Sequence, residues 1–309
     1  MIRHHLRVPT DDRQKMLLPE PGDCAALLAE NRRRLSAARL KIGNIPLARF
    51  RRLARGELLA AAADYTEGIT GRRAEADPDA PLVLSGHQPE FYHTGVWVKS
   101  FLLHRLATAA GSRGVNLVVD NDALKHTAMA VPLQRDGRLG VQRIPFTHPP
   151  AGVAFEADRP TSAEAMRRLA GEVGRSLATL DADSAFEQFA PLLEAAAAEG
   201  GNVAQALTRA RRRWEAEFGI DNLELPVSRA AETEAFRRFV LEVIAGIDRI
   251  GPAYNATLAE YRRLHGITNR ANPMPDLAGG DAFHELPFWI WREGGQRQRL
   301  EAQRVATGW

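Results

Sequence analysis

The sequence predicts an α/β fold: a Rossmann-like core on a parallel sheet, with a large helical N-terminal segment and a large helical insertion. Residues 81–85 and 115–119 are short apolar runs, and a helix-like segment over 95–110 separates them. Strand, helix and strand within about 40 residues form a βαβ unit, whose strands are parallel and buried. A third apolar run over 223–227 predicts one more strand.

Helices are expected before and after this unit. Asp23 is placed to cap the first helix, and Pro46 suits the first turn of the second. Thr161 and Glu164 have the spacing of a capping box, which indicates a helix start there. Asn202 is placed to cap a further helix.

The C-terminal part of the sequence predicts helices and a strand. An apolar helical stripe begins at Phe236, and Gly251 and Pro252 are expected to break the helix before it restarts over 254–264. The apolar run 286–291, followed by glycines and a polar segment, predicts a hairpin or a sheet-edge strand. We therefore expect four segments: a helical one over 1–80, the first half of the core with its ligand-binding turn over 81–150, a helical insertion over 151–219, and the second part of the core with the C-terminal hairpin over 220–309.

Composition limits the class of protein. The chain has 309 residues, of which 45% are hydrophobic and 26% are charged, as in globular proteins. This excludes a disordered chain, a collagen-like chain and a disulfide scaffold. The single cysteine, Cys24, cannot form an internal disulfide, so we expect a cytoplasmic protein. There is no run of the length that spans a bilayer and no secretory signal, so we expect no membrane association.

The charge balance bears on partners. The net charge of +3 permits an anionic ligand without indicating nucleic acid. The arginine runs 32–34 and 211–213 have acidic residues nearby, so we interpret them as solvated helix faces. We expect a small-molecule substrate rather than a nucleic acid.

The densest group of polar residues lies where the first predicted strand leads into its helix. Ligands of open α/β sheets bind at strand carboxyl ends, and a helix N-terminus favours anions. Lys99 lies one turn into the helix, where it can reach an anion. His87 and His93 are the candidates for proton transfer near neutral pH. The same turn offers four ligand-binding candidates: Gly86, Gln88, Thr94 and Gly95.

A second group follows the next strand. Asp120 and Asp122 stand at its carboxyl end and should face the same crevice as His87. They could act as catalytic groups that orient an amine, hydrogen-bond a ribose or hold a divalent metal, or they could form an Asx turn that ends the strand. A nucleotide or a divalent metal is the cofactor that such a crevice suits. Lys125, Asn272 and Arg292 are further ligand-binding candidates.

Residues 82–132 resemble the cysteine-adding enzymes (cysteine ligases) of bacillithiol synthesis, whose Rossmann-type core is similar to that of the nucleotidyltransferases. In that family a Gly-Gln-Gln segment opens a glycine-rich turn, a helix with a lysine follows, and the next strand leads to an acidic cluster. The matching positions here are Gly86, His87, Gln88, Thr94, Gly95, Lys99, Asp120 and Asp122. His87 replaces a glutamine of the family. The resemblance implies a Rossmann-type ligase that joins cysteine to an amino group.

Three functions follow from these patterns. The first is a small-molecule ligase or transferase that binds a nucleotide or another anionic substrate at the strand ends. The second is a metal-dependent glycosyltransferase or a phosphotransfer enzyme, because both use an Asp-x-Asp pattern after an apolar strand. The third is a non-catalytic binding module that forms a homodimer.

Overall fold

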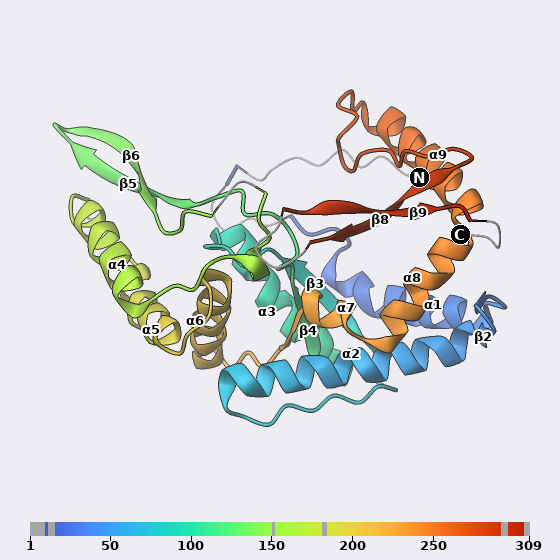
Figure 1. Cartoon of the computed structure of the whole chain (residues 1–309). Coiled ribbons are helices and arrows are strands. Elements are labelled where there is room, and N and C mark those ends of the chain that lie inside the picture. The colour runs from blue at the N-terminus through green and yellow to red at the C-terminus, as the bar shows by residue number, and fades with distance from the viewer. Residues whose placement is uncertain (1–9, 12–15, 150–151, 181–183, 292–295, 306–309) are drawn as a thin grey trace. The chain divides into compact units, whose positions relative to one another are not determined.

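The computed structural model describes residues 10–11, 16–149, 152–180, 184–291 and 296–305 (Figure 1). The chain divides into two compact units. The hairpin unit comprises residues 1–51, 234–290 and 298–309, and the sheet unit comprises residues 52–233 and 291–297. Each unit is built from separate stretches of chain, whereas the four segments expected from the sequence are continuous.

The sheet unit is organised around three parallel strands in the order β3-β4-β7. These are β3 (Val83–His87), β4 (Gly114–Val118) and β7 (Leu223–Pro226), and α3 (Thr94–Ala109) connects the first two. The expected parallel βαβ unit and its additional strand are confirmed. In the register of the sheet, Ser85, Asn116 and Glu224 lie side by side on one face.

Helix α2 (Leu47–Thr70) covers the other face of the sheet. It begins directly after Pro46, and the division between the units falls within it, after Arg51. Leu59 and its neighbours pack against the buried strand residues Val115, Leu223 and Leu225. The burial of this apolar face provides most of the driving force that holds α2 on the sheet.

Helix α3 packs closely against β4. An added Cβ on Gly114 would lie 2.5 Å from Leu103 Cγ and 2.7 Å from Asn222 Oδ1. The side-chain amide of Asn222 also donates to Ser100 O, 2.9 Å away. Glycine at position 114 therefore allows the helix to approach the strand more closely than any side chain would.

The remainder of the sheet unit contains a helical layer and a two-stranded ribbon, which lie together in Figure 1. The ribbon pairs β5 (Ala128–Arg135) with β6 (Arg138–Pro145). The helices are α4 (Ala163–Leu177), α5 (Phe186–Ala198) and α6 (Val203–Glu217), preceded by the 3-10 turn η2 (Phe155–Ala157), and the short α7 (Val227–Ala231) follows β7. Their common core includes Val131, Ile144, Met166, Leu193 and Leu207.

Two features of this region differ from the sequence interpretation. The β5–β6 ribbon was not expected; its turn at Asp136 and Gly137 has φ values of 52° and 72°, as a two-residue hairpin turn requires. The N-cap of α4 is Ser162, whose side chain accepts from Ala165 N, so the capping box proposed for Thr161 is wrong. Asn202 and Gln205 do form a capping box at the start of α6, as expected for Asn202.

The hairpin unit contains the remaining elements. They are the turn η1 (Pro21–Asp23), α1 (Cys24–Ala37), the short strands β1 (Lys41–Ile42) and β2 (Ile45–Pro46), α8 (Glu234–Ala245), α9 (Ile247–His265), and the antiparallel hairpin of β8 (Phe283–Ile290) and β9 (Gln298–Gln303). Its core comprises Val243, Ile247, Leu286 and Ala302. The run 286–291 thus lies largely within β8.

For these helices, the expected break is wrong and the expected cap at Asp23 is confirmed in its position only. The helix break falls at Gly246, and α9 continues through Pro252. Pro252 lies near the start of α9, where it removes a single backbone hydrogen bond. Asp23 occupies the N-cap position of α1 but makes no side-chain capping bond. In the part of the chain that the structure describes, no helix combines the length and apolarity that crossing a membrane requires.

Candidate functional site

The three parallel strands bring polar residues to one edge of the sheet. His87 ends β3, Asp120 follows β4, and Ser228 lies in α7, directly after β7. Backbone bonds continue past the strands, since Val119 N donates to His87 O at 3.0 Å. Carboxyl ends of parallel strands are the usual binding edge of α/β sheets. We call the residues at and directly after the ends of β3, β4 and β7, which include His87, Asp120 and Ser228, the carboxyl edge.

Asp120 is the most deeply buried side chain of the carboxyl edge, with 7% of its surface exposed. Its Oδ1 accepts from Ser228 N at 3.0 Å, and its Oδ2 accepts from Ser228 Oγ at 2.5 Å. Its carbonyl oxygen accepts from Glu156 N at 2.9 Å. Asp120, Ser228 and Glu156, which we call the Asp120 centre, therefore form a hydrogen-bonded group that joins three separate stretches of chain.

The carboxyl groups of the Asp120 centre are shifted toward their protonated forms. Burial raises the pKa of Asp120, although hydrogen bonds from Ser228 oppose the shift. Burial and the nearby charge of Asp120 raise the pKa of Glu156, whose carboxyl also interacts with Ser228 and Trp291. Two carboxyls of raised pKa that share a hydroxyl hold a proton more readily than exposed carboxyls do, which suits groups that exchange protons.

Asp122 lies in a different environment from Asp120. It accepts from Gln88 Nε2 at 3.1 Å and from Ala123 N at 2.9 Å, and it pairs with Lys125 Nζ at 3.3 Å and with the guanidinium of Arg297. Burial alone would raise the pKa of Asp122, but the bonds from Gln88 and Arg297 lower it to about 2. The Asp122 centre, which is Asp122 with Gln88, Lys125 and Arg297, thus holds a fixed negative charge at neutral pH.

The lowered pKa of Asp122 predicts a pH-dependent contribution to stability. The folded pKa is about 2 and the ordinary value 3.8, so the stabilising effect is complete above pH 4 and is lost as the pH falls to 2. We expect Asp122→Asn to lower the free energy of unfolding by about 1 kcal/mol at pH 7, after allowance for solvent screening. Urea unfolding of both proteins at several pH values measures this difference. A difference that stays constant from pH 6 to pH 2 would contradict the assignment.

His87 lies at the carboxyl edge and leads to the polar face of the sheet, which is the face that carries Ser85, Asn116 and Glu224. Its Nδ1 donates to Gln88 O at 3.1 Å, because a carbonyl oxygen can only accept. The ring of His87 packs edge-on against Tyr92, with centroids 5.3 Å apart. The guanidinium of Arg211 lies over the Tyr92 ring, 5.6 Å from its centroid. Burial raises the pKa of Tyr92 to about 12, so its hydroxyl keeps its proton.

A buried ionic network continues from Arg211. Its two terminal nitrogens contact Glu215 Oε2 at 2.8 Å and Glu224 Oε2 at 2.6 Å. Asn116 Nδ2 donates to Glu224 at 2.8 Å, and Trp97 Nε1 donates to Glu215 at 3.1 Å. Both carboxylates are fully buried. This buried ionic network therefore fixes α6 against β7 beneath the polar face of the sheet.

The burial of this network corrects the interpretation of residues 211–213. Arg211 and Arg212 are only 7% and 5% exposed, so they do not form a solvated face. Burial alone would lower the pKa of Arg211, but Glu224 and Glu215 raise it well above its ordinary value. Partner carboxylates on β7 and α6 therefore make the burial of these charges tolerable.

The other candidates lie in varied places. His93 is the N-cap of α3, where its Nδ1 accepts from Gly95 N at 3.1 Å. Thr94, Gly95 and Lys99 are exposed, and within the described residues the Lys99 side chain makes no hydrogen bond or ion pair. Asn272 belongs to the hairpin unit, where its carbonyl accepts from Arg262.

Two candidates need separate comment. An added Cβ on Gly86 would lie 3.1 Å from Leu117 Cβ, so packing against β4 accounts for this glycine. Arg292 lies outside the described residues.

Several residues of the carboxyl edge were not among the candidates. Ser228 follows the third predicted strand directly, so the rule that placed Asp120 at a strand end would also have found it. Glu156 and Arg297 carry no local signal, because only long-range folding brings them to this edge. Among the residues that the structure describes, no three His, Cys, Asp or Glu side chains are grouped to hold a metal ion.

A scan against protein-family models and a search of curated proteins both found nothing similar to this chain.

Proposed function

We propose that this chain is a cytoplasmic enzyme of the ligase or transferase class that acts on a small anionic substrate, such as a nucleotide, at the carboxyl edge. The observation that carries the proposal is the Asp120 centre, in which a buried carboxyl accepts from Ser228 Oγ at 2.5 Å. A carboxyl of raised pKa beside a hydroxyl is suited to general acid–base catalysis.

The two aspartates have different roles in this proposal. Asp120 moves a proton, because its pKa is raised by burial. Asp122 stays ionised and orients an amine or hydroxyl of the substrate, because its pKa is about 2. Pairs of carboxyls with opposite shifts are typical of sites that divide the acid–base and electrostatic tasks. Lys125 and Arg297 place two cations at the same edge, where they attract an anionic substrate.

The resemblance to the cysteine-adding enzymes supports the same class. The parallel order β3-β4-β7 and the helix α3 are features that such a core also has, and they support the proposal to that extent. In this proposal the amine or thiol of one substrate attacks an activated group of the other, such as one esterified to a nucleotide phosphate. The nucleophile loses its proton to ionised Asp120 as the new bond forms, and the phosphate leaves with the electron pair of the bond that breaks. Glu156 and Ser228 hold that carboxyl in place and share its proton.

A ligand screen tests the proposal. Thermal unfolding of the purified chain is followed with nucleotides, amino acids, sugar phosphates and divalent metals. A ligand at 100 times its dissociation constant adds ~2.7 kcal/mol, which raises the melting temperature by several degrees. We expect a nucleotide or amino acid to stabilise the wild type, and Asp122→Asn and Lys125→Ala to abolish the effect.

The matched control for this screen is Asp136→Asn, at the exposed tip of the β5–β6 ribbon. Asparagine also adopts the left-handed backbone found there, so the variant should fold and bind as the wild type does. Stabilisation by a metal alone would favour the glycosyltransferase or phosphotransfer function instead. If no compound stabilises the wild type, a binding module is favoured and the enzyme proposal is wrong.

A further inference from the structure

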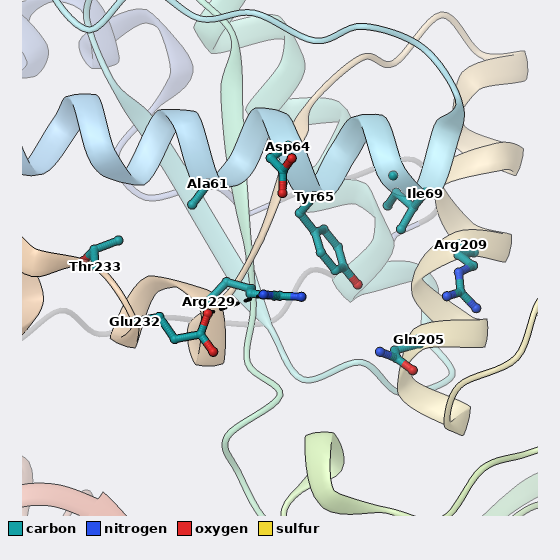
Figure 2. Close-up of a pocket in the computed structure, with 10 residues that line it drawn as sticks. Ala61, Asp64, Tyr65, Ile69, Gln205, Arg209, Arg229, Glu232 and Thr233 are labelled. Carbon is teal, nitrogen blue, oxygen red and sulfur yellow. Dashed lines mark hydrogen bonds and ion pairs between the residues drawn. The ribbon is translucent and has the colours of Figure 1, made fainter.

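A pocket of about 440 Å³ lies within the sheet unit, between α2, α6 and α7 (Figure 2). Its lining includes Tyr65 from α2, Gln205 and Arg209 from α6, and Arg229 from α7. In Figure 2 the polar ends of these four side chains point toward a common space. None of them takes part in the contacts of the Asp120 or Asp122 centres.

The hydroxyl of Tyr65 is a donor that faces this pocket. Within the described residues it makes no hydrogen bond, although most of the side chain is buried. Burial raises the pKa of Tyr65 to about 12, and the charges of Glu224 and Asp120 add to the shift. The hydroxyl therefore keeps its proton at neutral pH and can donate to a ligand.

The two guanidinium groups each have one terminal nitrogen available. Arg209 uses Nη1 for the carbonyl of Gly200, and its Nε lies 3.8 Å from Glu199. Arg229 uses Nη1 for Glu232 Oε2, at 3.4 Å. Across the described part of the chain, Nη2 of Arg209 and of Arg229 makes no hydrogen bond. Both cations therefore retain a donor for a ligand.

The capping box of α6 fixes the orientation of Gln205. Its Oε1 accepts from Asn202 N at 3.0 Å, while Asn202 Oδ1 accepts from Gln205 N. The side-chain oxygen is thus occupied, and Figure 2 shows the nitrogen end of the amide directed into the pocket. Gln205 therefore supplies a fourth donor, held in place by the start of the helix.

We propose that this pocket binds the phosphate group of a small phosphorylated metabolite. Four donors from three helices, two of them cationic, suit a tetrahedral oxyanion with three terminal oxygens better than a planar carboxylate with two. The volume suits a ligand of metabolite size. Asp64 and Glu232 also line the pocket, and their carboxylates accept hydrogen bonds from hydroxyl or amino groups of the ligand. The proposal needs nothing from the reaction proposed above.

The test measures binding of inorganic phosphate and of glucose 6-phosphate to the full chain by phosphorus NMR at constant ionic strength. We expect both probes to bind the wild type, and Arg229→Gln and Tyr65→Phe to weaken binding by about tenfold or more. The matched controls are Arg168→Gln, at an exposed position on α4, and Tyr254→Phe, on α9; both should bind as the wild type does.

Three outcomes would overturn the proposal. The first is that the wild type binds neither probe. The second is that Arg229→Gln binds both probes normally. Because Arg229 is exposed, this variant should fold, so it tests the phosphate site even if Tyr65→Phe does not fold. The third is that Lys125→Ala abolishes phosphate binding, which would place the anion at the carboxyl edge. Normal phosphate binding by Lys125→Ala supports the pocket whether or not the enzyme proposal survives.

Discussion

Arg211→Met is expected to lower the free energy of unfolding by about 3–5 kcal/mol. The substitution keeps an unbranched side chain of similar length but leaves Glu215 and Glu224 without their cation. Both carboxylates are fully buried, and Glu224 already has a pKa raised by burial. Breaking a buried ion pair by removing one partner leaves an uncompensated charge, which costs far more than the pair itself contributes. Urea unfolding at pH 7 measures the effect.

The control for this prediction is Arg167→Met. Arg167 pairs with Glu194 on the surface, where the arginine side chain is 64% exposed, so the same substitution should change the free energy of unfolding little. The double variant Arg211→Met with Glu224→Gln removes one of the unpaired charges and should recover part of the loss. If Arg211→Met and Arg167→Met lower the free energy of unfolding equally, the buried ionic network stabilises the fold no more than a surface ion pair does.

The second large effect is on catalysis. Once the screen provides a substrate, we expect Asp120→Asn to reduce kcat by about a hundredfold or more, because an amide cannot exchange a proton as a general acid or base. The variant keeps the local geometry, since an amide oxygen can still accept from Ser228 N while its nitrogen donates to Ser228 Oγ. Steady-state kinetics of both proteins at pH 7 test this expectation.

Stability distinguishes loss of chemistry from loss of fold in Asp120→Asn. Burial raises the folded pKa of Asp120 above 3.8, so the favourable contribution is complete below that value and is lost as the pH rises through the folded pKa. Burial thus makes the ionised form of Asp120 less favourable in the folded chain than in the unfolded one, so the uncharged variant should be at least as stable at pH 7. An inactive variant that is also less stable at pH 7 would indicate a structural role for Asp120 instead.

Local patterns in the sequence were sufficient to predict the parallel strands. The runs 81–85, 115–119 and 223–227 are apolar over strand length, and the helix-like segment between the first two leaves a parallel pairing as the natural arrangement. The same patterns placed His87, Asp120 and Asp122 at strand ends. The β5–β6 ribbon was missed, although Asp136-Gly137 is a strong hairpin signal, because its flanking strands alternate only weakly between apolar and polar residues.

The sequence by itself thus determined which strands form the sheet and which polar residues follow them, because these depend on short runs of neighbouring residues. Only the tertiary structure decided the partners of those residues. Asp120 and Ser228 are 108 positions apart, and Asp122 and Arg297 are 175 apart. The opposite pKa shifts of Asp120 and Asp122, the burial of Arg211 and the donors around the α2–α6–α7 pocket all depend on such distant pairs. Burial and long-range hydrogen bonds set these properties, and neither is encoded within a local stretch of chain.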